Sequence, residues 1–206
     1  MFKVLTSSAG ASGYPEFTLA TLPSASSALW SGRHILCTDL GPTGGTVLRS
    51  NGTRWRPNNG RLLLASVNAA AAVTGSTSRT ALATVALPYQ IMAYTGVVIE
   101  SEFLWSSTNN ANSKGIKVEL GTTTFHSSSG VSTASCLLLQ RIRLRGSASQ
   151  VAVGASLPAG VGSTVNAIVT GTEDLSSAKN LVFSAQLANS GDTATLEGYT
   201  ISLVLP

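Results

Sequence analysis

Apolar side chains alternate with small or polar ones along most of residues 79–206. The runs at 81–87 and 96–105 show this pattern most clearly, and clusters of Gly, Asn, Ser and Pro separate such runs. Short strands divided by turn residues are typical of an antiparallel β-sandwich. We therefore expect residues 79–206 to form an all-β, jelly-roll-like sandwich. Its strands are expected near 80–87, 96–105, 115–120, 122–126, 135–145, 149–153, 164–170, 180–188 and 193–205.

Three shorter segments precede this sandwich. Residues 1–16 begin apolar and become rich in Ser, Gly and Ala, which indicates a flexible N-terminal attachment arm. Residues 17–59 are expected to form a small β-hairpin module. Residues 60–78 are expected to form a connector, whose Ala-rich part is either a helical turn or an extended segment.

Asn51-Gly52 marks a hairpin inside the small module. The pair lies between two strand-like runs, 46–50 and 53–56. Type I′ turns need positive φ at both central residues, which favours Asn-Gly there. The sequence therefore predicts a tight hairpin closed by these two residues.

The chain carries few charged residues, and their distribution is uneven. Charged residues make up 11% of the sequence, against a usual share of about 25%. Such a surface is expected where copies of one chain cover each other. The formal net charge of +4 comes from the N-terminal third. This basic excess is either a docking face or a set of solvated arginines, and we expect no nucleic-acid partner.

Two cysteines, Cys37 and Cys136, lie within apolar stretches and show no metal-binding or disulfide spacing. This pattern fits a protein synthesised in a reducing cytoplasm. The start of the chain does not resemble a signal peptide, and no apolar run reaches the ~20 residues of a membrane span. We expect no membrane insertion.

The groups needed for catalysis are sparse. His34 and His126 are the two histidines, and no G-x-S-x-G motif surrounds a serine. Glu100 and Glu102 are two residues apart, so their side chains share one face of a strand. Such a pair is what the polar face of a half-buried strand ordinarily carries. A glycan-degrading enzyme using paired carboxylates is the alternative. We expect no enzyme activity, no metal site and no cofactor.

Arg141, Arg143 and Arg145 alternate with apolar residues, so their side chains share one strand face. Like charges side by side repel each other and need compensation. Glutamates on neighbouring strands are the expected partners, and an anionic glycan or a lipopolysaccharide phosphate is the alternative. The candidate glutamates are Glu100, Glu102 and Glu119.

Several turn and strand signatures resemble tail fibres and related virion proteins of tailed bacteriophages. The segments that carry the resemblance are Ala20–Ala25, Asn51–Pro57, Leu104–Lys114, Val118–Gly121, Gln140–Gly146 and Gln186–Tyr199. The resemblance implies a homotrimer of β-sandwiches on the virion, on the tail or the capsid surface. It also implies attachment to another virion protein through the N-terminal region.

The function implied by the resemblance is that of a short tail fibre or tail tip that binds a host surface receptor, such as a glycan or lipopolysaccharide. The alternative is a capsid decoration or head-fibre protein attached by its N-terminal part. Loops on a rigid sandwich usually carry binding, so receptor contacts are expected in residues 106–114, 126–133 and 188–192. The candidate receptor-binding residues are Asn109, Asn110, Asn112, Lys114, His126, Asn189 and Asp192. The candidate virion-attachment residues are Phe2, Val4 and Leu5.

Overall fold

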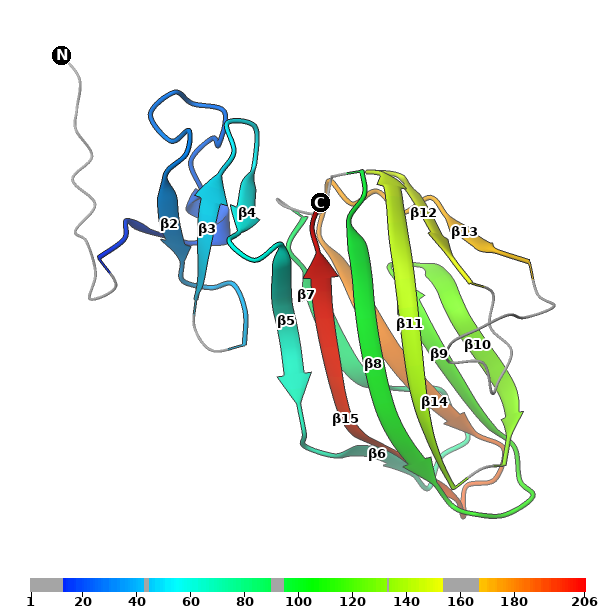
Figure 1. Ribbon diagram of the computed structural model, residues 1–206. Helices are drawn as coiled ribbons and strands as arrows, with labels where there is room; N and C mark the ends of the chain where they lie inside the picture. The colour runs from blue at the N-terminus through cyan, green and yellow to red at the C-terminus, as the bar shows by residue number, and fades with distance from the viewer. Residues whose placement is uncertain (1–12, 43–44, 90–94, 133, 154–166) are drawn as a thin grey trace. The chain divides into compact units, whose positions relative to one another are not determined.

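The computed structural model describes residues 13–42, 45–89, 95–132, 134–153 and 167–206 (Figure 1). The chain divides into two compact units, one ending at Leu62 and the other running from Leu63 to Val204. Strands form both units, so the all-β prediction is confirmed. Residues 1–12 of the expected arm, with Phe2, Val4 and Leu5, lie outside the described residues.

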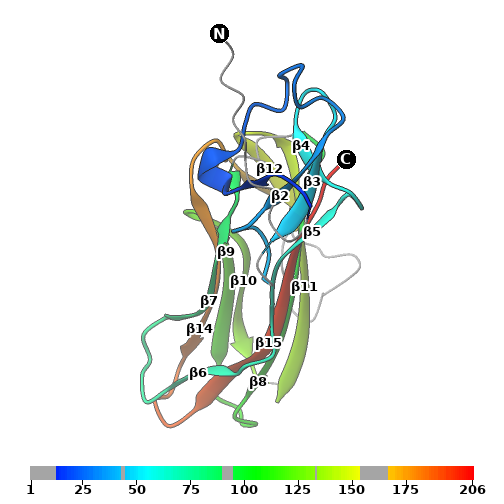
Figure 2. The ribbon, with the colours of Figure 1, turned by 90° about the vertical axis from the view of Figure 1, so that its left-hand side faces the viewer.

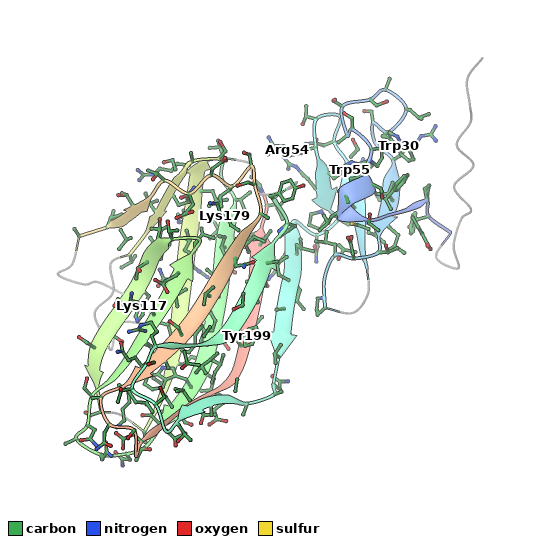
Figure 3. All side chains as sticks on the ribbon, turned by 180° about the vertical axis from the view of Figure 1, so that it is seen from behind. Trp30, Arg54, Trp55, Lys117, Lys179 and Tyr199 are labelled. Carbon is green, nitrogen blue, oxygen red and sulfur yellow. The ribbon has the colours of Figure 1, made fainter. Side chains whose placement is uncertain are left out.

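The first unit is a four-stranded sheet with the order β1-β2-β3-β4. Its elements are β1 (Glu16–Phe17), a 3₁₀ turn η1 (Leu19–Thr21), β2 (His34–Cys37), β3 (Thr46–Ser50) and β4 (Trp55–Pro57). One face of the sheet buries Ile35, Cys37, Leu48 and Trp55. Trp30 packs edge-on against Trp55, with ring centroids 6.1 Å apart, and closes this small core (Figure 3).

The hairpin predicted at Asn51-Gly52 is present, but its turn differs from the expected type. β3 and β4 pair antiparallel, with Ser50 opposite Trp55. Gly52 has a φ of 87°, whereas no non-glycine residue of the described chain has a positive φ, so the type I′ turn is wrong. The Asn51 side-chain oxygen instead accepts hydrogen bonds from the backbone N–H groups of Thr53 (3.1 Å) and Arg54 (2.9 Å). An Asx turn therefore closes a longer loop.

The second unit contains two packed sheets. Its strands are β5 (Arg61–Val67), β6 (Ala71–Thr74), β7 (Thr80–Leu87), β8 (Val98–Ser107), β9 (Lys114–Leu120), β10 (Thr123–Val131), β11 (Ser135–Gly146), β12 (Ser149–Ala152), β13 (Val169–Gly171), β14 (Lys179–Leu187) and β15 (Thr193–Val204). The larger sheet has the order β13-β12-β11-β8-β15-β5, with β6 also pairing with β15. The smaller sheet has the order β10-β9-β14-β7.

The chain crosses repeatedly between the two sheets, from β7 to β8, from β8 to β9, from β10 to β11 and from β14 to β15, as in a jelly roll. The β5/β6 segment, β15, β8 and β11 form one layer, and β7, β14, β9 and β10 form the other. Figure 2 shows these layers edge-on. The prediction of a jelly-roll-like sandwich is therefore confirmed.

Inward-facing side chains from both sheets fill the sandwich. Phe103 of β8 stacks on Phe183 of β14, with ring centroids 4.7 Å apart. Trp105, Ile116 and Val118 are almost fully buried beside them. This packing follows from the period-two alternation read from the sequence, because each strand turns one set of alternate residues toward the interior.

Two boundary predictions are wrong. Residues 60–78 do not form a connector, because β5 and β6 pair with β15 and complete the larger sheet. Residues 126–133 do not form a loop, because β10 continues through Val131. The Ser-rich composition of that segment hid the strand, since serine is common in turns and its small side chain also fits a sheet edge. Residues 164–166 of another expected strand lie outside the described chain.

Candidate functional site

Four connections meet at one end of the sandwich, which we call the four-loop end (lower end in Figure 1). They are residues 75–79, 108–113, 132–134 and 188–192, and the structure describes all of them except residue 133. Backbone hydrogen bonds join three of them to each other: Gly75 N–H donates to Ser190 O (3.0 Å), and Ala188 N–H donates to Ser113 O (3.0 Å). Ala134 of the remaining connection accepts from Ser107 N–H at the end of β8 (2.8 Å). The end is therefore one connected surface.

A buried polar cluster, which we call the loop clamp, fastens two of these loops. It consists of Asn110, Lys114 and Asp192. The Lys114 ammonium donates to Asn110 Oδ1 (2.6 Å) and to the Thr108 carbonyl oxygen (2.7 Å), and lies 3.9 Å from Asp192 Oδ2. Asn110 Nδ2 donates to Asp192 Oδ1 at 2.6 Å. The clamp thus bridges the β8–β9 loop and the β14–β15 loop.

The two charged members of the clamp are inside the protein. The side chain of Lys114 is 0% exposed and that of Asp192 is 4% exposed. Burying an ammonium and a carboxylate is costly unless each is paired and hydrogen-bonded, so the contacts of the clamp must persist for the end to stay folded. The clamp therefore holds the β8–β9 loop and the β14–β15 loop to each other.

The structure separates the predicted receptor-binding residues into three groups. Asn109 and Asn189 are exposed on the four-loop end, and Asn110 and Asn112 are half-buried there. Lys114 and Asp192 are brought to the same end, but the expectation that they are exposed is wrong. Their side chains support the surface from below, because a pairing partner far away in the sequence draws each one inward.

His126 does not belong to the four-loop end. It lies within β10, opposite Val118, and is buried. Burial without a counter-charge lowers the pKa of His126 to about 4. Its Nε2 atom has no hydrogen-bond partner within the described part of the chain. The prediction that His126 is an exposed loop residue is therefore wrong, since it lies in the interior as a neutral imidazole.

A second buried carboxylate, Glu173, lies at the opposite end of the sandwich. It accepts hydrogen bonds from the Thr122 backbone N–H (2.8 Å) and from the Thr122 and Thr123 hydroxyls (2.6 and 3.0 Å), and pairs with Lys179 at 3.1 Å. Burial raises its pKa, but these donors outweigh burial and lower the pKa to about 2. Glu173 ties the β9–β10 turn to the β13–β14 loop. No local sequence signal connects Glu173 with Thr122.

The arginine stripe lies on the outer face of the larger sheet. Arg141 pairs with Glu100 of β8 at 3.1 Å, as predicted. Glu119 is a wrong partner because it lies on the other sheet, where it is 3.6 Å from Lys117. Figure 3 shows Lys117 on that sheet.

The same outer face carries two exposed leucines. Leu104 of β8 is directly opposite Leu137 of β11, and they are 47% and 48% exposed. Two large apolar side chains side by side form a small patch, and such patches commonly mark contact with another protein. The outer face of the larger sheet therefore combines this pair of exposed leucines with the arginine stripe.

The two cysteines are free thiols. Cys37 is buried, and burial together with the neighbouring Asp39 carboxylate raises its pKa to about 12. Because the thiolate is the nucleophilic form, this thiol is unreactive near neutral pH.

Comparison with known proteins finds no family model and no curated sequence that matches this chain. Within the described ranges, no helix has the length and apolar character to span a bilayer. Nor do the described side chains bring three or more His, Cys, Asp or Glu residues together in a metal-binding group.

Proposed function

We propose that the chain is a non-enzymatic structural protein of a bacteriophage virion, a short tail fibre or tail tip that binds a host surface receptor with its four-loop end. The loop clamp is the observation that carries the proposal. Loops already fixed in one conformation lose little conformational entropy on binding, so a clamped surface is suited to recognition. The assignment to a virion rests on the resemblance of the turn and strand signatures described above.

The path of the chain supports this orientation. β5 begins and β15 ends at the end of the sandwich opposite the four loops (Figure 1). If the chain is attached through its N-terminal region, the four-loop end is the one that the connection to the first strand does not occupy. This end would then be available to a receptor. Receptor contacts would come from exposed residues of this end, including Asn109 and Asn189.

The homotrimer is part of the same proposal. The low charge content and the Leu104–Leu137 patch both favour contact between copies. Light scattering after size exclusion should give a particle of about three times the 21.1 kDa mass of one chain. A stable monomer at micromolar concentration would contradict the trimer.

The receptor proposal is tested by competition. Purified protein should block adsorption of the virions to host cells, and the variant Asn109→Arg/Asn189→Arg should lose this effect. The control Ser127→Arg/Ser129→Arg adds the same charge at exposed positions of β10 and should compete like the unmodified protein. Equal competition by both variants would refute binding through the four-loop end.

The position of the chain on the virion distinguishes a tail protein from the alternative, a capsid decoration or head-fibre protein. Immunogold labelling of virions should place the chain on the tail. Labelling of the head would overturn the tail assignment and favour the alternative, whose attachment would use the same N-terminal region.

A further inference from the structure

The outer face of the first unit's sheet carries a row of basic side chains. Alternation along β2, β3 and β4 turns Ile35, Leu48 and Trp55 inward. The alternate residues therefore point away from the core. Among them, His34 is directly opposite Arg49, and Arg49 is directly opposite Arg56. We call these three side chains the basic row.

The two arginines of the basic row have no carboxylate partner among the described residues. Like charges directly opposite each other on adjacent strands destabilise a sheet. Within the described residues, neither Arg49 nor Arg56 forms an ion pair, and the Nε atom of Arg56 is buried without a hydrogen-bond partner. Of the unit's two acidic residues, Asp39 accepts from Leu19 N–H (2.8 Å) and from the Cys37 thiol (3.3 Å). Glu16 of β1 is exposed on the same face beside Leu36 of β2, has an interaction of its own, and is separated from Arg49 of β3 by β2. An external anion would relieve the repulsion.

Apolar and aromatic side chains lie next to the basic row. Leu36 and Val47 are opposite each other on the same face, and both are half-buried. The ring of Tyr14 lies 6.1 Å from that of His34, and Tyr14 is 38% exposed. His34 is held in place by Asn58, with Nε2 and Oδ1 3.1 Å apart. The face thus combines two guanidinium groups with a flat apolar strip.

We propose that this face binds an acidic protein segment. Carboxylates of the segment would accept hydrogen bonds from Arg49 and Arg56, whose planar guanidinium groups suit two-point pairing with carboxylates. Apolar side chains of the segment would cover Leu36 and Val47. Tyr and Arg beside apolar side chains are typical of the centre of a protein–protein interface.

The composition of the face favours a protein over nucleic acid. Nucleic-acid binding depends on many cations that follow a phosphate backbone, whereas this face has two arginines and an apolar strip. The proposal of a carboxylate-binding surface is supported by the strand register and side-chain positions of the first unit alone. Its use to attach the chain to another virion protein rests on the proposed function.

The proposal is tested with the full chain and a defined probe. The probe is a fluorescein-labelled peptide, acetyl-Glu-Glu-Leu-Glu-Glu-Leu-Glu-amide, with the same peptide containing Gln in place of every Glu as its neutral partner. Fluorescence anisotropy at low salt measures the affinity, and ¹⁵N NMR locates the site. The acidic peptide should bind and shift the amide resonances around His34, Val47 and Arg56, and the neutral peptide should not bind.

Arg49→Gln/Arg56→Gln should weaken binding at least about tenfold, because each lost charge-assisted hydrogen bond is worth roughly 1.4 kcal/mol or more. Arg49→Lys/Arg56→Lys keeps the charge, leaves the fold undisturbed and should bind with an intermediate affinity. The matched control Arg143→Gln/Arg145→Gln removes two arginines that have no ion pair in the described second unit, and should change the affinity less than about twofold.

Three results would overturn the proposal. They are equal affinity for the two Gln double variants, resonance shifts that lie outside this face, and tighter binding of a single-stranded DNA of the same charge through the basic row. The test needs no virion or host. Peptide binding together with negative virion labelling would therefore keep the carboxylate site and refute the virion assignment alone.

Discussion

Replacing Lys114 with methionine should destabilise the sandwich strongly. The substitution keeps most of the aliphatic stem but removes the ammonium, with its hydrogen bonds to Asn110 Oδ1 (2.6 Å) and the Thr108 carbonyl (2.7 Å). It also leaves the Asp192 carboxylate, whose side chain is 4% exposed, without its counter-charge. Removing one partner of a buried pair costs about 3–5 kcal/mol. For a unit of this size, that loss corresponds to a fall in Tm of about 10 °C.

Urea titration at pH 7, followed by far-UV circular dichroism, measures this loss. Hydrogen exchange of the peptide that covers residues 106–114 reports whether the loops open. The control is Lys117→Met, the same substitution on the same strand. Lys117 is 31% exposed and lies 3.6 Å from Glu119, so its loss should cost at most about 1 kcal/mol.

A second substitution tests the cause of the loss. Asp192→Asn in the Lys114→Met background removes the stranded negative charge, so the double variant should lose less stability than the sum of the two single variants. If Lys114→Met costs no more than Lys117→Met, the clamp does not stabilise the four-loop end and the reasoning is refuted.

Three further predictions concern acid stability and assembly. The imidazole of His126 takes up its proton near pH 4 in the folded state and near pH 6.5 in the unfolded state. The stability that it contributes is therefore complete above pH 6.5 and falls as the pH drops toward 4. His126→Leu should make the free energy of unfolding depend less on pH across this window. The Glu173 carboxylate takes up its proton near pH 2 in the folded state and near pH 4.5 in the unfolded state. Its contribution to stability is therefore complete above pH 4.5 and falls toward pH 2. Glu173→Gln should lower the free energy of unfolding at pH 7 and remove its pH dependence between 4.5 and 2. Leu104→Asp/Leu137→Asp should convert the proposed trimer to monomers in light scattering, because charge would enter the apolar patch.

Each of these three predictions has a matched control and a contradicting result. Ser128→Ala, beside His126 on β10, should leave the pH slope in place, and an unchanged slope in His126→Leu would contradict the burial argument. Glu102→Gln alters an exposed carboxylate and should have little effect on acid unfolding, so equal behaviour of Glu173→Gln would remove the role of Glu173. Thr84→Asp, exposed on β7, should leave the mass unchanged, and an intact trimer in the leucine variant would exclude this face as the contact.

The sequence predicted what depends on local alternation. Strands such as β7, β9 and β14 appear within a residue or two of their expected bounds, because one buried face imposes a period of two on the side chains. Leu62-Leu63-Leu64 lacks that alternation and therefore predicts no strand, although the segment completes the larger sheet as β5. Its pairing with β15 is a contact between distant parts of the chain.

The sequence predicts the loop around residues 109–113 but not the burial of the lysine that follows it. The polar run Asn109–Lys114 indicated an exposed loop, and the loop is present. The burial of Lys114 depends on Asp192, which reaches it only once β14 and β15 have brought the second loop alongside. Nothing local to Lys114 distinguishes a solvated lysine from a buried one. The same reason hid Glu173, whose donors lie on a turn far away in the sequence.

The position of the loop clamp divides the four-loop end into parts that tolerate change differently. Asn189, Ser190 and Gly191 are exposed and precede the buried Asp192, and the strands on either side are anchored in opposite sheets. Ser190 uses only its backbone carbonyl, which accepts from Gly75 N–H (3.0 Å), so its exposed side chain could be exchanged while Asp192 keeps its place beneath the surface. The clamp would keep the loop in place while its exposed side chains change. New binding specificities could then arise without changes to the core of the sandwich.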